Sequence, residues 1–188
     1  MEQSNKIPKY TIEIKTSLEP FANLRYRKST VLIMCQDEFG RFLLGAKPYL
    51  YPEGIARMLG GGVDKNEDIK IAAQREIKEE LNYSISLDKI KPLCDVITYA
   101  QSPTNKYEMI SHVFYIHVDS KKVSPGDDIK NILYLNEKEY VEMANKLLSL
   151  PQDLIYNDKE GHFSWGDFGK VYGFIQMTSL DEFKLNNN

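Results

Sequence analysis

Three glutamates, Glu76, Glu79 and Glu80, are spaced at i, i+3 and i+4 in a segment whose composition favours a helix. At roughly 100° per residue, this spacing places their carboxylates within about a 100° arc of one helical face. Like charges four residues apart on a helix repel each other by about 0.2–0.5 kcal/mol per pair. A positive group is therefore expected over this face, and a hard divalent cation with oxygen ligands is the leading candidate.

The helix that carries these glutamates is predicted over residues 67–81, directly after three successive glycines at 60–62. Asn66 is the predicted N-cap, and Glu67 suits the positive end of the helix dipole. Asn82 follows the last turn, where a left-handed residue commonly ends a helix. Three adjacent glycines favour a close approach of the backbone to a metal or a substrate. The apolar side of the helix consists of Ile69, Ala72, Ala73 and Ile77.

The stretch runs Gly61, Glu67, Arg75-Glu76-Ile77 and Glu79-Glu80. This spacing resembles the Nudix box, the signature of hydrolases that act on nucleoside diphosphates linked to another group. Two positions depart from the family pattern: Asn82 replaces the usual glycine, and Tyr83 replaces an aliphatic residue. Asparagine is the next-best residue for a left-handed helix end, so the geometry is expected to survive. Seven positions match the box: Gly61, Glu67, Arg75, Glu76, Ile77, Glu79 and Glu80.

The resemblance implies hydrolysis of a phosphoanhydride bond by metal-activated water, with Mg²⁺ as the expected cation and Mn²⁺ as the alternative. Metal ions polarise phosphoryl oxygens and lower the pKa of bound water. By the resemblance, Glu76, Glu79 and Glu80 are the carboxylate ligands, and the backbone carbonyl of Gly60 helps to hold the metal. It also implies that Arg75 orients a neighbouring carboxylate, and Glu79 lies within helical reach four residues on.

Four further residues are candidates for the site. Asp127 and Asp128 follow a Pro-Gly turn, and a loop acid in this family often assists as a metal ligand or base. Adjacent acids after Pro-Gly are equally ordinary turn residues. Tyr99 lies at about the distance from the box at which related dinucleoside polyphosphate hydrolases place a base-stacking tyrosine. With 12 tyrosines in the chain, this hint is weak. Arg57, just before the glycines, is a candidate substrate-binding residue.

Strand and helix signals alternate along the chain and predict an α/β fold, a Nudix-like α/β/α sandwich with a mixed β-sheet and a C-terminal helical extension. A polar connection is predicted over residues 151–163. One domain is expected over residues 1–188, with a core of about 10–150 and an extension of about 151–188. Strands are predicted at 10–15, 29–35, 41–46, 55–59, 91–100, 108–118 and 129–135, and further helices at 137–148 and 165–180.

The composition is that of an ordinary globular protein, with 42% hydrophobic and 27% charged residues among 188. A net charge of −3 argues against a nucleic acid duplex as partner. The resemblance implies a small-molecule nucleotide-type diphosphate substrate. No stretch reaches 18 apolar residues, so no membrane partner is expected. Cys35 and Cys94 lie in apolar runs and are interpreted as buried hydrophobes in a reducing, cytoplasmic location. The oligomeric state stays open, including a homodimer.

Two other functions remain. The first is a catalytically weak Nudix-fold nucleotide-binding or regulatory module, although a pure sensor has no need for three mutually repelling carboxylates. The second is a Nudix-fold isomerase of isoprenoid diphosphates, for which the chain shows no second cysteine or glutamate motif of that type.

Overall fold

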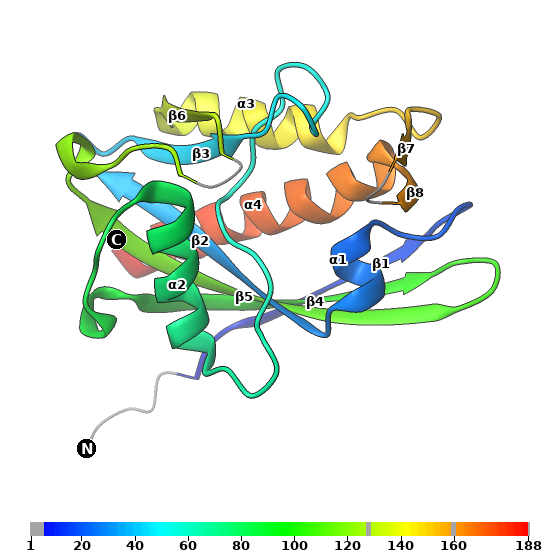
Figure 1. The fold of residues 1–188 in the computed structure, drawn as a ribbon, viewed down its shortest axis with the longest axis horizontal. Coiled ribbons are helices and arrows are strands. Elements are labelled where there is room, and N and C mark those ends of the chain that lie inside the picture. Colours follow the sequence, from blue (N-terminus) through cyan, green and yellow to red (C-terminus); the bar gives the residue numbers. More distant parts are fainter. Residues whose placement is uncertain (1–5, 127–128, 159–160, 188) are drawn as a thin grey trace.

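A mixed sheet of six strands forms the centre of the computed structural model, which describes residues 6–126, 129–158 and 161–187 (Figure 1). The spatial order is β1–β4–β5–β2–β3–β6. Strands β1 and β4 pair in parallel, as do β2 and β5, and the remaining pairs are antiparallel. The strands are β1 (Lys9–Lys15), β2 (Ser29–Asp37), β3 (Phe42–Ala46), β4 (Lys91–Gln101), β5 (Lys106–Val118) and β6 (Asn131–Leu135).

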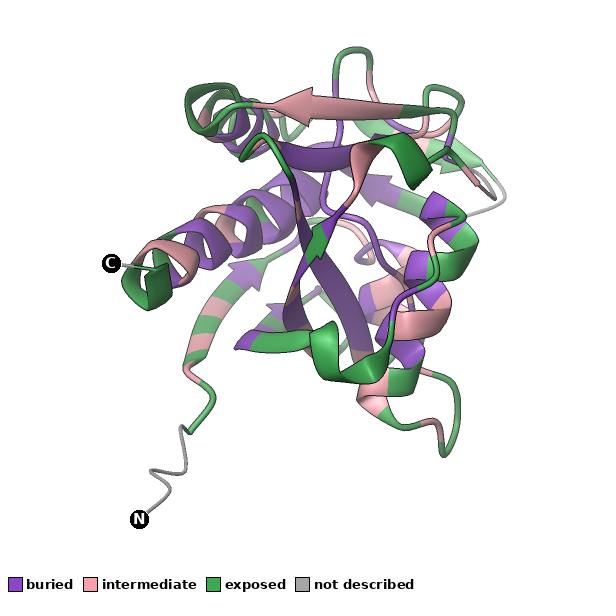
Figure 2. Cartoon of the chain, turned by 90° about the vertical axis from the view of Figure 1, so that its left-hand side faces the viewer, coloured by how far each residue is buried: buried purple, intermediate pink, exposed green. Residues whose placement is uncertain are grey.

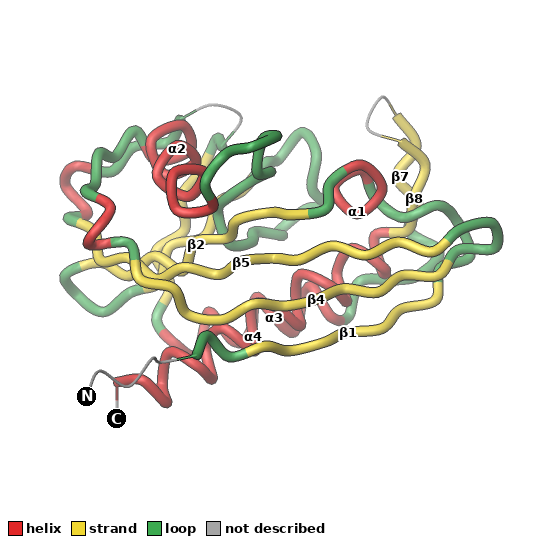
Figure 3. Tube along the Cα trace, turned by 90° about the horizontal axis from the view of Figure 1, so that it is seen from below, coloured by secondary structure: helices red, strands yellow, loops and turns green. Residues whose placement is uncertain are grey.

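Helices cover both faces of this sheet. Figure 3 shows α2 on one side of the strands and α3 and α4 on the other, which confirms the predicted α/β/α arrangement. Within the described part of the chain, none of the helices combines the length and the apolarity that a membrane crossing requires. The helices are α1 (Ala22–Tyr26), α2 (Ile69–Leu81), α3 (Glu137–Leu148) and α4 (Trp165–Asn187), with short 3-10 turns at Leu87–Lys89 and Ser120–Lys122.

Two hydrophobic cores form because side chains alternate across the sheet. Strand β2 contributes to both: Leu32 belongs to the cluster that includes α3 and α4, whereas Val31 and Cys35 belong to the cluster that includes α2. Figure 2 shows that buried residues concentrate in the central strands and on the inner sides of the helices. Cys35 and Cys94 are buried and form no disulfide, which confirms their interpretation as small apolar residues.

Helix α2 begins at Ile69, two residues later than predicted, and its N-cap is Asp68. The Asp68 carboxylate accepts hydrogen bonds from the backbone N–H groups of Lys70 and Ile71, at 2.9 and 3.1 Å. The prediction of Asn66 as N-cap was wrong, because that residue has φ 66° and belongs to the preceding turn. The predicted end is confirmed: Asn82 is left-handed, with φ 50° and ψ 24°.

Two other predictions need correction. Residues 55–59 form isolated bridges at Arg57 and Leu59 instead of a strand, since the segment touches β3 and then β2 at single points. Residues 151–163 include a hairpin of β7 (Ile155–Asp158) and β8 (Gly161–Ser164) where a polar connection was expected. Aromatic contacts stabilise these four-residue strands. The rings of the cross-strand partners Tyr156 and Phe163 stack with centroids 4.9 Å apart, and Phe163 also packs edge-on against Phe21 at 6.1 Å.

Helix α4 contains Gly166, Gly169 and Gly173, a residue type that disfavours helices, and its packing explains the last two. It lies against α3, and a β-carbon at Gly169 would collide with the backbone carbonyl oxygen of Leu147. At Gly173 a β-carbon would crowd Leu148 and the Ala144 carbonyl. Close helix approach thus outweighs the helix propensity lost at a glycine, about 1 kcal/mol relative to alanine. Buried residues of α4 belong to the same core cluster as those of β2 and α3.

Gly169→Ala is expected to lower the free energy of unfolding by about 1–3 kcal/mol through overpacking, although alanine is the better helix former. Urea unfolding followed by circular dichroism measures the change. Asp181→Ala, at an exposed position of α4, serves as control and should stay within about 0.5 kcal/mol of the parent. A stabilised Gly169→Ala variant would contradict the close contact between the helices.

Candidate active site

The glycine turn crosses the end of β2 and is held there by backbone hydrogen bonds. The Val31 N–H donates to the Gly61 carbonyl at 2.9 Å, and Thr30 forms a bridge with Gly62. Gly60 has φ +126°, and a β-carbon there would collide with the Val31 carbonyl oxygen. A β-carbon at Gly61 would strike the carboxylate of Glu76. Residues without a side chain are therefore required at positions 60 and 61, where the turn meets helix α2.

Glu80 is buried against this turn. The Gly60 N–H donates to Glu80 Oε2 at 2.6 Å, and Lys47 Nζ lies 3.4 Å from Glu80 Oε1. Burial raises the pKa of Glu80, while the positive charges of Arg57 and Lys47 act to lower it. The site thus holds a carboxylate in a desolvated position with positive groups arranged around it.

Arg75 links the remaining acids of the helix to the turn. Its Nη1 donates to Glu76 Oε1 at 2.7 Å and to Glu79 Oε2 at 3.0 Å. Its Nη2 donates to the carbonyl of Gly62 at 2.8 Å. Burial raises the pKa of Glu76, and the hydrogen bond from Arg75 opposes that rise. The predicted reach from Arg75 to Glu79 is present, and one guanidinium also contacts Glu76.

Glu67 has a different structural role from the one its position suggested. It precedes α2 and receives hydrogen bonds from Arg75 Nε and Nη2, at 2.9 and 3.0 Å. It also accepts the backbone N–H of Asp64 at 2.9 Å. The hydrogen bond from Arg75 lowers the pKa of Glu67. Glu67 therefore fixes the arginine that contacts Glu76 and Glu79, instead of complementing the helix dipole from the first turn.

These residues line a polar cleft of about 330 Å³. The cleft brings together the glycine turn, Arg75 and all three box carboxylates, as the spacing predicted. Sequence reasoning missed its basic wall, which includes Lys47 and Arg27. Lys47 directly follows β3, and it belongs to no recognisable sequence motif. The expectation of a positive group near the three carboxylates was the only signal that could have predicted it. The lining residues are Asn23, Arg27, Lys47, Arg57, Gly60, Gly61, Gly62, Asp64, Arg75, Glu76, Glu79 and Glu80.

Arg57 lies at the inner wall of the cleft and is buried. Its Nε donates to the Tyr51 hydroxyl at 2.6 Å, and its Nη1 donates to the Met58 carbonyl at 2.9 Å. The guanidinium lies over the ring of Tyr172, 4.7 Å from the centroid. These contacts fix a permanent positive charge beside Glu80. Such a charge is suited to a phosphate group of a substrate.

The other candidates lie elsewhere. Tyr99 is half-exposed in β4 and lines a separate cavity with Glu13 and Lys106, so its stacking role stays a prediction. Asp127 and Asp128 fall outside the described residues. The segment before them is held against the end of α2, where the Gly126 N–H donates to the Glu80 carbonyl at 3.0 Å.

The donor set fits a hard cation by its chemistry, because carboxylate oxygens are the preferred ligands of Mg²⁺ and Mn²⁺. In the described ranges, however, no three acidic, histidine or cysteine side chains already converge as a metal cage. Glu76 and Glu79 are turned toward Arg75, and Glu80 toward the Gly60 amide. The side chain of Glu79 is 47% exposed and has room to rotate toward a cation.

A larger cavity of about 710 Å³ is lined by Glu38, Asp119, two tyrosines, a histidine and three lysines. It contains none of the seven residues that match the box, only the departing Tyr83, and has mixed charge. The smaller cleft is therefore the better candidate for chemistry, because it combines the buried carboxylates with the glycine backbone.

Comparison with known families identifies the domain that contains this cleft. The sequence model of the NUDIX domain matches residues 25–157, which include the glycine turn, α2 and the sheet from β2 to β6. The chain belongs to the Nudix family. No curated protein matches it significantly in sequence.

Several solved structures resemble this chain at low sequence identity. The dihydroneopterin triphosphate pyrophosphohydrolase of E. coli aligns with TM-score 0.51 and 12% identity, over 66% of this chain and 88% of its own. The NUDIX domain of Shewanella oneidensis NrtR, complexed with ADP ribose, gives 0.49 and 14%, over 62% and 77%. A MutT/nudix family protein from Enterococcus faecalis gives 0.45 and 21%, over 57% of this chain and 43% of its own.

Gly60→Ala is expected to reduce the free energy of unfolding by roughly 2–5 kcal/mol, since it adds backbone strain to a steric collision. Gly54→Ala is the matched control: Gly54 also has positive φ, at +74°, but a β-carbon there meets no atom within 4 Å. It should cost only about 1 kcal/mol. Equal losses for the two variants in urea unfolding would show that the collision with Val31 is absent.

Arg75→Lys is expected to lower the free energy of unfolding by about 1–2 kcal/mol, because lysine cannot reproduce the forked contacts and partial exposure screens the charges. Lys78→Arg is the reciprocal exchange at an exposed position of the same helix and should change little. Thermal and urea unfolding in the absence of divalent cations compare the two. An unchanged Arg75→Lys variant would argue against the role of Arg75 as the link between acids and turn.

Proposed function

We propose that this Nudix protein is a Mg²⁺-dependent pyrophosphohydrolase that cleaves a phosphoanhydride bond in a nucleoside diphosphate-linked substrate. The observation that carries the proposal is the meeting of Glu76, Glu79 and Glu80 with the glycine turn in one polar cleft. Bound Mg²⁺, or Mn²⁺ as the alternative, would supply polarisation of phosphoryl oxygens and a water of lowered pKa.

The residues proposed to hold the cation are the three box carboxylates and the backbone carbonyl of Gly60. Asp127 and Asp128 are proposed as a further source of a ligand or base, since the chain just before them contacts the end of α2. The raised pKa values of Glu76 and Glu80 have a common cause in burial, which disfavours their charged forms. A divalent cation would offset that cost and give the buried carboxylates a function.

The basic wall of the cleft is proposed to bind the substrate. Lys47 and Arg57 lie on the side of Glu80, and Arg57 is fixed by hydrogen bonds to Tyr51 and Met58. Fixed positive groups bind phosphate oxygens without reorganising, which favours both orientation and stabilisation of developing charge. Arg75 acts as a positioning residue, because it contacts Glu76 and Glu79 and anchors them to the turn.

Glu79→Gln and Glu80→Gln are each expected to lower kcat by several orders of magnitude, because an amide is a poor ligand for a hard cation. Phosphatase-coupled release of phosphate from a panel of nucleoside diphosphate derivatives with Mg²⁺ measures the rates. Glu142→Gln, on the outer side of α3 with its side chain 58% exposed, is the control and should retain the parent rate. Parent-like turnover by both site variants would refute the metal-site assignment.

The competing function is a binding or regulatory module without turnover. Its distinguishing result is nucleotide affinity by calorimetry together with no phosphate release over hours in the same Mg²⁺ buffer. The retention of all three box glutamates in one cleft favours the hydrolase. Product masses separate hydrolysis from isomerisation of a diphosphate, since only hydrolysis adds water.

A further inference from the structure

We infer that an aromatic cavity next to the carboxylate cleft is the subsite for a nucleobase of the substrate. The inference rests on the proposed function and assigns the position of one part of its substrate. The cavity has a volume of about 180 Å³ and is lined by ten residues. Five of them are aromatic: Phe21, Tyr51, Phe163, Trp165 and Phe168.

The cavity and the cleft share a boundary. Asn23, Lys47 and Arg57 line both spaces. Two of these residues are cationic, and Arg57 is held in place by the Tyr51 hydroxyl, which belongs to the aromatic wall. A phosphate at this boundary would meet both positive charges, with acidic metal-ligand candidates on one side and aromatic rings on the other. A nucleotide has the matching order of groups: ring, sugar and phosphates.

The cavity is built largely by parts of the chain outside the matched NUDIX domain. Six of its ten lining residues precede residue 25 or follow residue 157. They come from the start of α1, from β8 and from the first turn of α4. The family-matched region contributes the carboxylates and the basic boundary. Segments outside the matched domain thus supply most of the wall that would distinguish one substrate from another.

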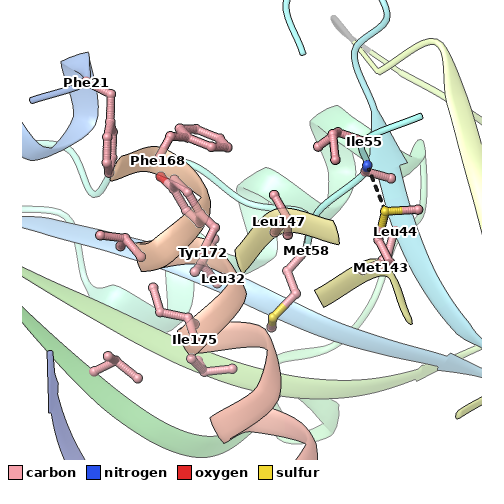
Figure 4. Close-up of a cluster of buried hydrophobic side chains, with 14 of the residues drawn as sticks. Phe21, Leu32, Leu44, Ile55, Met58, Met143, Leu147, Phe168, Tyr172 and Ile175 are labelled. Carbon is pink, nitrogen blue, oxygen red and sulfur yellow. Dashed lines mark hydrogen bonds between the residues drawn. The ribbon is translucent and has the colours of Figure 1, made fainter. Parts of the chain in front are cut away.

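Contacts among the rings make this wall rigid. The ring centroids of Phe21 and Phe168 are 5.2 Å apart in an edge-on arrangement, and Phe21 also lies 5.5 Å from Tyr172. Figure 4 shows these three side chains converging from α1 and α4. Trp165 packs edge-on against Tyr51 at 6.2 Å and against Phe168 at 4.9 Å. Aromatic walls fixed in this way lose little conformational entropy when a ring binds between or beside them.

The size of the cavity selects the ligand class. At about 180 Å³ it is smaller than a site for a whole drug-sized ligand, roughly 300–1,000 Å³. It therefore has room for one compact group of the substrate and excludes a long isoprenoid chain. Aromatic side chains favour a planar ring through stacking and edge contacts. Among groups joined to a diphosphate through a sugar, the nucleobase has this shape.

Trp165 provides a direct test, because it is the single tryptophan of the chain and lines the cavity. Its fluorescence is recorded during titration with AMP, GMP, CMP and UMP in Mg²⁺ buffer. These monophosphates contain no phosphoanhydride bond, so the readout is independent of turnover. Ribose 5-phosphate is the matched probe without a base. A saturable change with at least one nucleotide and none with ribose 5-phosphate is expected; equal responses, or none to any nucleotide, would overturn the subsite.

A substitution in α1 tests the position of the base. Ala22→Leu places extra volume into the cavity from a half-buried position and should raise the Kd of the responding nucleotide about tenfold or more. Tyr26→Leu puts the same residue at an exposed position of α1 and should leave Kd unchanged. Tyr99→Ala should also leave Kd unchanged. A tenfold loss in Tyr99→Ala with parent affinity in Ala22→Leu would move the base to the other cavity.

The two proposals fail in different ways. A fluorescence response without phosphate release from any substrate would refute the hydrolase and leave the subsite standing. Phosphate release from a nucleotide substrate with no Trp165 response, and with an unchanged KM in Ala22→Leu, would refute the subsite and leave the hydrolase standing. The fluorescence titration uses the unaltered protein, so a folding defect in Ala22→Leu does not remove the test.

Discussion

The burial of two carboxylates against a glycine turn is the constraint on which the rest of this structure depends. Glu80 accepts the Gly60 amide, and Glu76 occupies the space that a side chain at residue 61 would need. Burial disfavours both charges, as their raised pKa values show. Positive groups from separate segments offset this cost. Arg75 comes from the same helix, and Lys47 and Arg57 come from the chain that follows β3.

The surrounding elements serve to fix this contact. The hydrogen bond between Val31 and Gly61 attaches the turn to strand β2. The apolar side chains of β2 on the face toward α2 pack against that helix. The helix is capped at Asp68 and ends at the left-handed Asn82. On the opposite face, α3 and α4 cover the sheet. The turn and the acidic helix are thus joined to one rigid sheet and cannot separate without loss of core packing.

The candidate active site and the proposed base subsite come from different parts of the chain. The carboxylates, the glycine turn and the basic boundary lie inside the region that matches the NUDIX domain, residues 25–157. Most of the aromatic wall next to them comes from α1, β8 and α4, outside that region. When the candidate reacting groups and the wall beside them come from different segments, the wall can change while the reacting groups stay fixed. Arg57 joins the two parts through the Tyr51 hydroxyl.

The sequence by itself determined the features that depend on local spacing: the carboxylate face of α2, the glycine turn, the left-handed end at Asn82 and the alternation of strands and helices. Periodicity within one element is a local property, so it can be recognised in the sequence. It did not reveal the N-cap at Asp68, because Asn66 is an equally good capping type and only the turn geometry separates them. It missed the β7–β8 hairpin, which is local in sequence but has only four residues in each strand. It also missed the position of Lys47 and the aromatic cavity. These features were decided by tertiary structure, since they arise where segments far apart in sequence meet, and no spacing within a single segment records such a meeting.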